Sequence, residues 1–162
     1  MKIEIHHYVD LSKDDFHDLI ALRIAVFVVE QNCPYIELDG KDKQAYHLVV
    51  KTEENKIVGT LRILSPGAVY PEASIGRVAS HPDYRDKKIG HLMMDHAMKF
   101  IKTEMGNPNI RISAQSHLCN YYAKYGFVKT GKEYLEDGIP HSEMLFLNGN
   151  NKLDDSPSSG RC

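Results

Sequence analysis

The sequence has little excess charge, few cysteines and no long apolar run. Lysine and arginine number 20 against 22 acidic residues, and this balance argues against bulk nucleic-acid binding, which needs a basic surface. The three cysteines, Cys33, Cys119 and Cys162, form no CxxC pair, and their odd number fits a reducing compartment better than a disulfide scaffold. No stretch has the length of a membrane span, and the N-terminus lacks the apolar core of a signal peptide. We therefore expect a cytoplasmic protein without membrane or nucleic-acid partners.

Several motifs of nucleotide-dependent and metal-dependent enzymes are absent as well. The chain contains neither GxxxxGK[ST] nor GxGxxG. It has nine histidines, but no HExxH and no Cys/His pair at zinc spacing, so we expect no metal. Ser116 and His117 are adjacent in the sequence and do not by themselves make a hydrolase triad.

The composition is that of a globular protein followed by a polar tail. At 162 residues, with 42% hydrophobic and 26% charged residues, the chain is long enough to bury a core. We expect one domain over residues 1–147. Residues 148–162 are mostly Asn, Asp, Ser, Pro and Gly, and are predicted to form no core of their own.

Residues 73–101 combine a short strand, a basic turn and an amphipathic helix. Residues 74–80 mix β-branched and small side chains and end before Pro82, which cannot donate to a strand ladder. After the turn at 85–88, apolar residues recur with the period of a one-sided helix, at Ile89, Leu92, Met93, Ala97, Phe100 and Ile101. Free N–H groups at the start of a helix bind anions, and Gly90 lets a ligand approach the backbone. The pattern predicts a phosphate site, with a solvated basic connection as the alternative.

Apolar patterns predict further elements along the chain. Further strands are expected at residues 2–9, 46–52, 57–64, 110–114 and 141–147. Helices are expected after the N-cap Ser12, with an apolar stripe from Phe16 to Val28, and at residues 115–124. Arg23 lies on that stripe, where its long side chain should reach solvent. Because a helix connects the strands at 74–80 and 110–114, they should be parallel neighbours or near-neighbours in a mixed sheet with helices packed on it.

A second motif is the segment QSHLCNYYAKYGF, residues 115–127. Tyr121 and Tyr122 point about 100° apart on a helix, so they cannot both face the same pocket. Packing in the core or on the surface is the alternative role for each ring.

The two motifs together resemble the acetyl-CoA site of the GCN5-related N-acetyltransferase (GNAT) family. Residues 85–90 fall on its Arg/Gln-x-x-Gly-x-Gly/Ala signature, with Lys88 in place of the first glycine and a charge suited to pyrophosphate. Residues 122–127 match its Tyr-x-x-x-Gly-Phe element, and residues 22–42, 75–78 and 136–141 resemble the ElaA-like branch. The resemblance implies the GNAT fold, an α/β (α+β) architecture. Its mixed, mostly antiparallel sheet has six to seven strands, about four flanking helices, and a central parallel strand pair that opens to a CoA cleft.

The resemblance also implies an acetyl transfer from acetyl-CoA, as co-substrate, to a primary amine. The backbone of residues 78–80 would bind the pantetheine arm, and N–H groups of residues 86–91 would bind the pyrophosphate. The implied cofactor-binding residues are Val78, Ala79, Ser80, Arg85, Asp86, Lys87, Lys88, Ile89, Gly90, His91 and Gln115. The amine would attack the acetyl group directly. Tyr122 would be the catalytic acid for the departing thiolate, because a phenol keeps its proton at neutral pH.

The base and the acceptor remain open at this point. Candidate bases are Glu30, Glu37, Asp39, His47 and His141, and all of these except His47 are also predicted to bind substrate. Together with Asp42, the acidic residues at 37–39 would suit a cationic amine of a small molecule or peptide. A solvated loop is the alternative.

Two other functions share part of these features. A non-catalytic CoA-binding sensor would use the same cofactor site without an acid at Tyr122. An acyltransferase like the acyl-homoserine-lactone synthases is suggested by the similar Val-Phe-x-x-Glu-Gln element at residues 26–31. We expect a monomer or homodimer.

Overall fold

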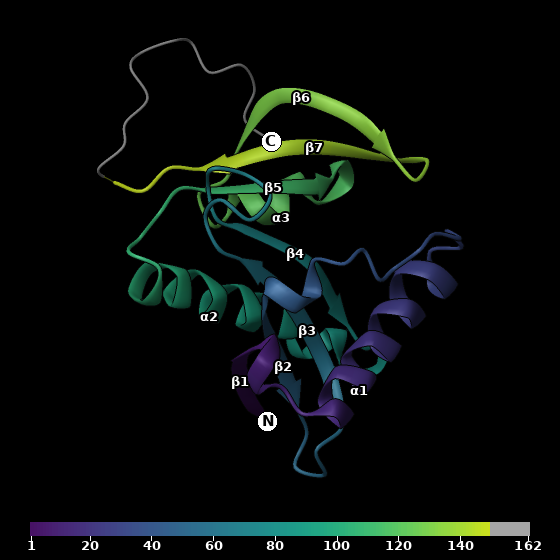
Figure 1. Cartoon of the computed structure of the whole chain (residues 1–162). Coiled ribbons are helices and arrows are strands. Elements are labelled where there is room, and N and C mark those ends of the chain that lie inside the picture. Colours follow the sequence, from purple (N-terminus) through teal and green to yellow (C-terminus); the bar gives the residue numbers. More distant parts are fainter. Residues whose placement is uncertain (150–162) are drawn as a thin grey trace.

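Over residues 1–149, which the computed structural model describes, seven strands form two antiparallel sheets (Figure 1). The first sheet has the order β1-β2-β3-β4, made of β1 Lys2–His7, β2 Tyr46–Lys51, β3 Ile57–Leu64 and β4 Ser74–Ser80. The second has the order β5-β7-β6, made of β5 Ile110–Gln115, β6 Val128–Glu136 and β7 Ile139–Phe146. The α-helices are α1 Lys13–Arg23, α2 Ile89–Glu104 and α3 Cys119–Ala123. From residue 150 onward, the predicted polar tail lies outside the described residues.

Helices cover both faces of the first sheet, with α1 and α2 on opposite sides (Figure 1). Leu48 and Val50 of β2 belong to the apolar cluster that includes Met93 of α2, whereas Val49 between them packs in the cluster with Leu19 of α1. Successive strand residues point to opposite faces, so a strand that is apolar on both sides is buried on both sides. Within residues 1–149, none of the helices is both long enough and apolar enough to span a membrane.

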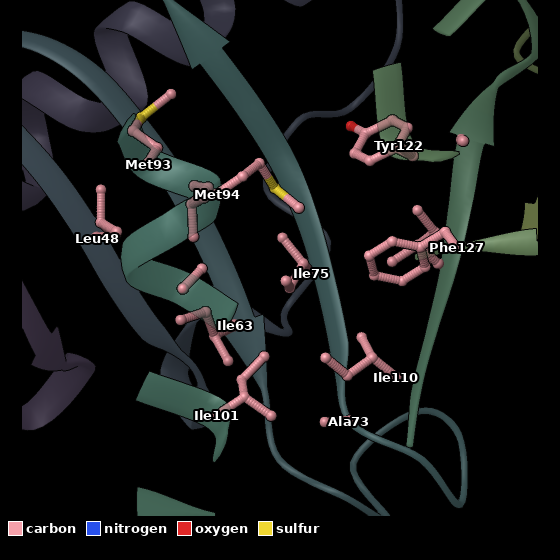
Figure 2. Packing of buried hydrophobic residues seen from close by; sticks show 14 of the residues in the cluster. Leu48, Ile63, Ala73, Ile75, Met93, Met94, Ile101, Ile110, Tyr122 and Phe127 are labelled. Atoms are coloured by element: carbon pink, nitrogen blue, oxygen red, sulfur yellow. The ribbon is translucent and has the colours of Figure 1, made fainter. Parts of the chain in front are cut away.

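The α2-side core continues into the second sheet. Figure 2 shows Ile75 of β4 with Met94 of α2 on one side and with Ile110 and Phe127 on the other. A single apolar cluster therefore holds the two sheets together.

The parallel strands β4 and β5 meet at one end and then separate. The Ala73 N–H donates to Asn109 O at 3.1 Å, and the Arg111 N–H donates to Ala73 O at 2.8 Å, which makes a single parallel bridge between Ala73 and Ile110. Past that bridge the two strands belong to different sheets in the described chain. The predicted parallel relation is confirmed, and past this bridge the strands divide into the two antiparallel sheets.

A β-bulge in β4 accompanies this separation. Thr60 of β3 pairs with Ala79 and Arg62 pairs with Gly76, so two residues of β4 stand opposite Leu61 alone. The first of them, Arg77, has a φ of 53°, in the left-handed region that non-glycine residues seldom adopt. A bulge bends its strand and increases the local twist, which explains why β4 leaves the direction of β5.

The first helix begins as predicted but changes form halfway. The Asp15 N–H donates to Ser12 Oγ at 3.0 Å, which confirms the predicted N-cap. After Arg23 the chain continues as a π-helix, Ile24–Glu30, and not as the regular helix that the apolar stripe predicts. Arg23 is only 1% exposed, so the prediction that its side chain reaches solvent is wrong.

Candidate functional site

A cleft of about 650 Å³ opens where β4 and β5 separate. Its walls come from β4, β5, α3, the loop after the π-helix and the turn between β6 and β7. Cys33 Sγ donates to Asp137 O at 3.4 Å and so joins that loop to that turn. The predicted site residues that line the cleft are Asp39, Val78, Gln115, Tyr122 and His141. Gln115 pairs with His141 across β5 and β7, which sets these two predicted residues side by side.

The predicted phosphate site lies at the start of α2. A 3₁₀ turn, Pro82–Lys87, leads into Lys88, which has left-handed φ and ψ of 54° and 35°. Among residues 1–149, no side chain caps this 16-residue helix, so its first-turn N–H groups are available to an anion. Ile89 is 1% exposed and packs in the core, which fixes the start of α2 against the first sheet. The geometry suits a pyrophosphate group.

Replacing Lys88 with glycine should raise the free energy of unfolding by about 0.5–1 kcal/mol, because a side chain in the left-handed region is strained and glycine is not. Lys88→Ala keeps a Cβ there and should leave stability near that of the wild type. Both variants remove a charge beside the predicted phosphate and should weaken CoA binding by about two- to fivefold. Urea denaturation and calorimetric titration measure the two effects. Equal stability of the glycine and alanine variants would rule out strain at this position.

The space beside Gly90 is occupied by the side chain of Tyr121, whereas the sequence predicts that a ligand approaches the backbone there. A Cβ added at Gly90 would lie 3.1 Å from the hydroxyl oxygen of Tyr121 on α3. The Tyr121 ring lies 5.0 Å from that of His91, and His91 Nδ1 lies 2.6 Å from the hydroxyl oxygen of Tyr125. These contacts hold α3 against the first turn of α2, and they engage the side chain of His91, which is predicted to bind cofactor.

Arg85 and Glu30 form an ion pair that ties the end of β4 to the π-helix. Arg85 Nη1 and Nη2 donate to the two carboxylate oxygens of Glu30 at 2.6 and 2.8 Å. Arg85 Nη2 also donates to Ser80 O at 3.2 Å. The hydrogen bond from Arg85 holds the pKa of Glu30 below its ordinary value. Glu30, predicted to bind substrate or act as base, is therefore engaged by an arginine of the same chain.

Tyr122 lies in the wall of the cleft and is 8% exposed. Figure 2 shows its ring above Phe127, with the hydroxyl oxygen on the side of β4. Burial raises the pKa of the Tyr122 hydroxyl to about 12, so the group is protonated at neutral pH. Tyr121 packs toward α2 and lies outside the cleft lining, as the angle between neighbouring helix positions predicts. Tyr122 is thus placed to donate a proton and is a poor proton acceptor.

A buried ion-pair network behind the cleft has Arg23 as its innermost member. Arg23 Nε donates to Glu37 Oε1 at 2.5 Å, and Arg23 Nη1 donates to Asp42 Oδ1 at 2.7 Å. Glu37 and Asp42 are 4% and 3% exposed. The alternative of a solvated acidic loop is therefore wrong for these two residues.

Two arginines from the first sheet complete the network. Arg62 of β3 donates to Asp39 at 2.9 Å and to Asp42 at 3.1 Å. Arg77, at the bulge of β4, donates to Glu37 at 3.0 Å. The sequence analysis missed both arginines as part of the site. No local pattern connects them to the acidic loop, because each partner lies at least 20 residues away along the chain.

The carboxylates of the network are already paired with arginines, and those of Asp39 and Asp42 remain charged. Burial raises the pKa of Asp39, but hydrogen bonds from Arg62 and from the Lys41 N–H outweigh it and hold the pKa well below its ordinary value. Burial also raises the pKa of Asp42, but Arg23 and, to a smaller extent, Arg62 outweigh it and lower the pKa. These ion pairs hold the loop in place as one wall of the cleft. They also leave little unpaired negative charge for a cationic substrate.

His141 is the third residue of β7, lines the cleft, and is 8% exposed. Its Nδ1 lies 2.7 Å from Ile139 O, and its Nε2 lies 3.2 Å from Glu136 Oε2. The Tyr134 ring stacks on the imidazole with the ring planes 16° apart. The imidazole is therefore fixed in orientation by a carbonyl, a carboxylate and a ring.

Comparison with known sequences identifies similar proteins over most of the chain. A family model described as an acetyltransferase (GNAT) domain matches residues 17–147. A UPF0039 protein of Synechocystis is 39% identical over 137 residues, which cover 85% of this chain and 89% of that protein. Protein ElaA of Escherichia coli is 34% identical over 139 residues, which cover 85% of this chain and 91% of ElaA.

Solved structures show the same fold. An acyl-CoA N-acyltransferase from Pseudomonas aeruginosa superposes with a TM-score of 0.85 and 36% identity, covering 91% of this chain and 100% of that one. The crystal structure of Escherichia coli ElaA has a TM-score of 0.83 and 32% identity, covering 90% of this chain and 99% of that one. The separating strands, the cleft and the α2 N-terminus thus belong to an architecture found in acyltransferases.

Proposed function

The chain belongs to the GNAT acetyltransferase family, and from this we propose that it transfers an acetyl group from acetyl-CoA to an amine of a small molecule or peptide. The family and the fold support acyl-CoA-dependent N-acyl transfer in general. We further propose that the acyl group is acetyl, that the acceptor is an amine, and that the amine attacks the acetyl group directly.

The observation that carries the proposal is the open edge of β4. Within the described residues, β4 and β5 are joined only at Ala73 and Ile110, and residues 76–78 of β4 line the cleft. An extended pantetheine arm can pair with such an edge in the way that a peptide adds a strand to a sheet. The N-terminus of α2 follows β4 after one turn and supplies N–H groups for the pyrophosphate, with the charge of Lys88 beside them.

Backbone and side-chain groups of the cleft would carry out the transfer itself. A backbone N–H of β4 would polarise the acetyl carbonyl, as in an oxyanion hole. The amine attacks the carbonyl carbon, so a C–N bond forms and the C–S bond breaks without a covalent enzyme intermediate. Tyr122, protonated at neutral pH, gives its proton to the departing sulfur. Gln115, whose Nε2 donates to Gln31 Oε1 at 3.1 Å, connects β5 to the loop on the far side of the cleft.

Acetyl-CoA and a panel of polyamines, amino sugars, amino acids and peptides test this function directly. Free CoA thiol should appear with at least one amine, with an equal amount of acetylated amine by mass spectrometry. Reactions without amine and without protein are the controls. CoA binding without thiol release across the panel would contradict the enzyme and favour a CoA-binding sensor.

A further inference from the structure

The carboxylates predicted as bases are poorly suited to take a proton. A general base works best when its pKa lies near the operating pH. The hydrogen bond from Arg85 lowers the pKa of Glu30, and the arginine network lowers that of Asp39. Glu37 is buried between Arg23 and Arg77. His47 is fully buried outside the cleft lining, where burial lowers its pKa.

The surroundings of His141 differ from those of the other candidates. The carbonyl oxygen of Ile139 can only accept, so the 2.7 Å contact assigns a proton to Nδ1, and Nε2 is the nitrogen that has the lone pair when the ring is neutral. The Glu136 carboxylate lies 3.2 Å from His141 Nε2, and the Glu136 side chain is 52% exposed. Both residues line the cleft that Tyr122 also lines. An imidazole nitrogen and an accessible carboxylate therefore lie side by side in the lining of the cleft.

We propose that His141 Nε2 is the general base, and that the Glu136 carboxylate holds an aliphatic ammonium group beside it. This inference rests on the proposed acetyl transfer. The ammonium gives one proton to Nε2, and the neutral nitrogen attacks the acetyl carbon. As the C–S bond breaks, the nitrogen loses its second proton. One proton ends on the CoA sulfur by way of Tyr122, and His141 releases the other to water, so one proton is set free in each turnover.

The charged and titratable groups around the imidazole agree with this role. Glu136 of β6 and Asp137 of the turn are acidic, and Tyr134 of β6 stacks on the ring. From β5, Gln115 pairs opposite His141. The carboxylate of Glu136, 3.2 Å from Nε2, lies beside the positive charge that the ring gains when it takes the proton. The acidic turn also favours a cationic acceptor over an anionic one.

A comparison of two nucleophiles separates a base from a structural residue. With an alkyl amine that the wild type acetylates, His141→Gln should lower kcat by about 10²-fold or more. With hydroxylamine, which is mostly unprotonated at neutral pH and needs no base before attack, the loss should be only a few fold. His117→Gln, at an exposed histidine outside the cleft lining, is the matched control and should lose nothing. Equal losses with both nucleophiles would overturn the assignment of His141.

The role of the Glu136 carboxylate is tested by a separate variant. Glu136→Gln should raise KM for the alkyl amine severalfold while leaving hydroxylamine turnover unchanged. An unchanged KM for the alkyl amine would remove Glu136 from the proposal.

Nitrogen NMR of the wild-type histidines tests the same geometry without turnover. Below its midpoint of proton uptake His141 should carry protons on both nitrogens, and above that midpoint on Nδ1 alone. A neutral form protonated on Nε2 would overturn the inference even if His141→Gln fails to fold. Absence of turnover with every amine would instead defeat the proposed function, and the base with it.

Discussion

Tyr122→Phe is expected to lower kcat by about 10²–10³-fold while acetyl-CoA binds nearly as well as to the wild type. The substitution removes one hydroxyl group and keeps the ring that packs 6.2 Å from Phe127. The cofactor contacts proposed for β4 and α2 do not involve that hydroxyl. Because burial raises the pKa of this phenol to about 12, its proton is present throughout the neutral range and is lost as the pH rises toward that value. Steady-state kinetics and calorimetric CoA titration measure the two quantities.

Tyr121→Phe is the matched control for this experiment. Tyr121 precedes Tyr122 on α3, but it packs on α2 and lies outside the cleft lining. Its hydroxyl lies against Gly90 of α2 and away from the cleft, so its removal should leave the cleft unchanged. Turnover should stay near that of the wild type. An undiminished kcat in Tyr122→Phe, or an equal loss in both variants, would show that Tyr122 is not the acid.

Arg23→Met should lower the free energy of unfolding by about 3–5 kcal/mol, the largest stability effect that we expect from the network. Methionine fills much of the same volume, but Glu37 would keep only Arg77 as a cationic partner and Asp42 only Arg62, while both carboxylates remain almost fully buried. A buried charge that loses a partner is costly because water cannot replace that partner. Urea denaturation followed by circular dichroism measures the loss.

Arg85→Met separates burial from ion pairing as the cause. Arg85 also makes two hydrogen bonds with a carboxylate, but the side chains of this pair are both 41% exposed. Exposed pairs contribute about 0–1 kcal/mol, so this variant should unfold close to the wild type. Similar losses for the two variants would mean that the buried position of Arg23 does not set its effect on stability.

The elements that the sequence predicts well are those that depend on neighbouring residues. The Ser12 cap, β2, β3, β4 and the start of α2 follow from side-chain periodicity and from residues that end a strand or begin a helix. The strand β6 was missed because it is mostly exposed on both faces, so it has no apolar alternation to detect. The π-helix was missed because its apolar residues also fit the period of a regular helix.

The sequence by itself determined the turn before α2, the helix that follows it, and the different directions of Tyr121 and Tyr122. Each of these depends on contacts within a few residues. Only the tertiary structure decided that Arg23 is buried, that β4 and β5 separate after one bridge, and that His141 stands beside Glu136 in the cleft with Tyr122. The network pairs residues 14 to 40 positions apart, and the bulge at Arg77 is visible only against its partner strand. Such features depend on the packing of distant segments, and one chain's local pattern does not encode which distant charges meet.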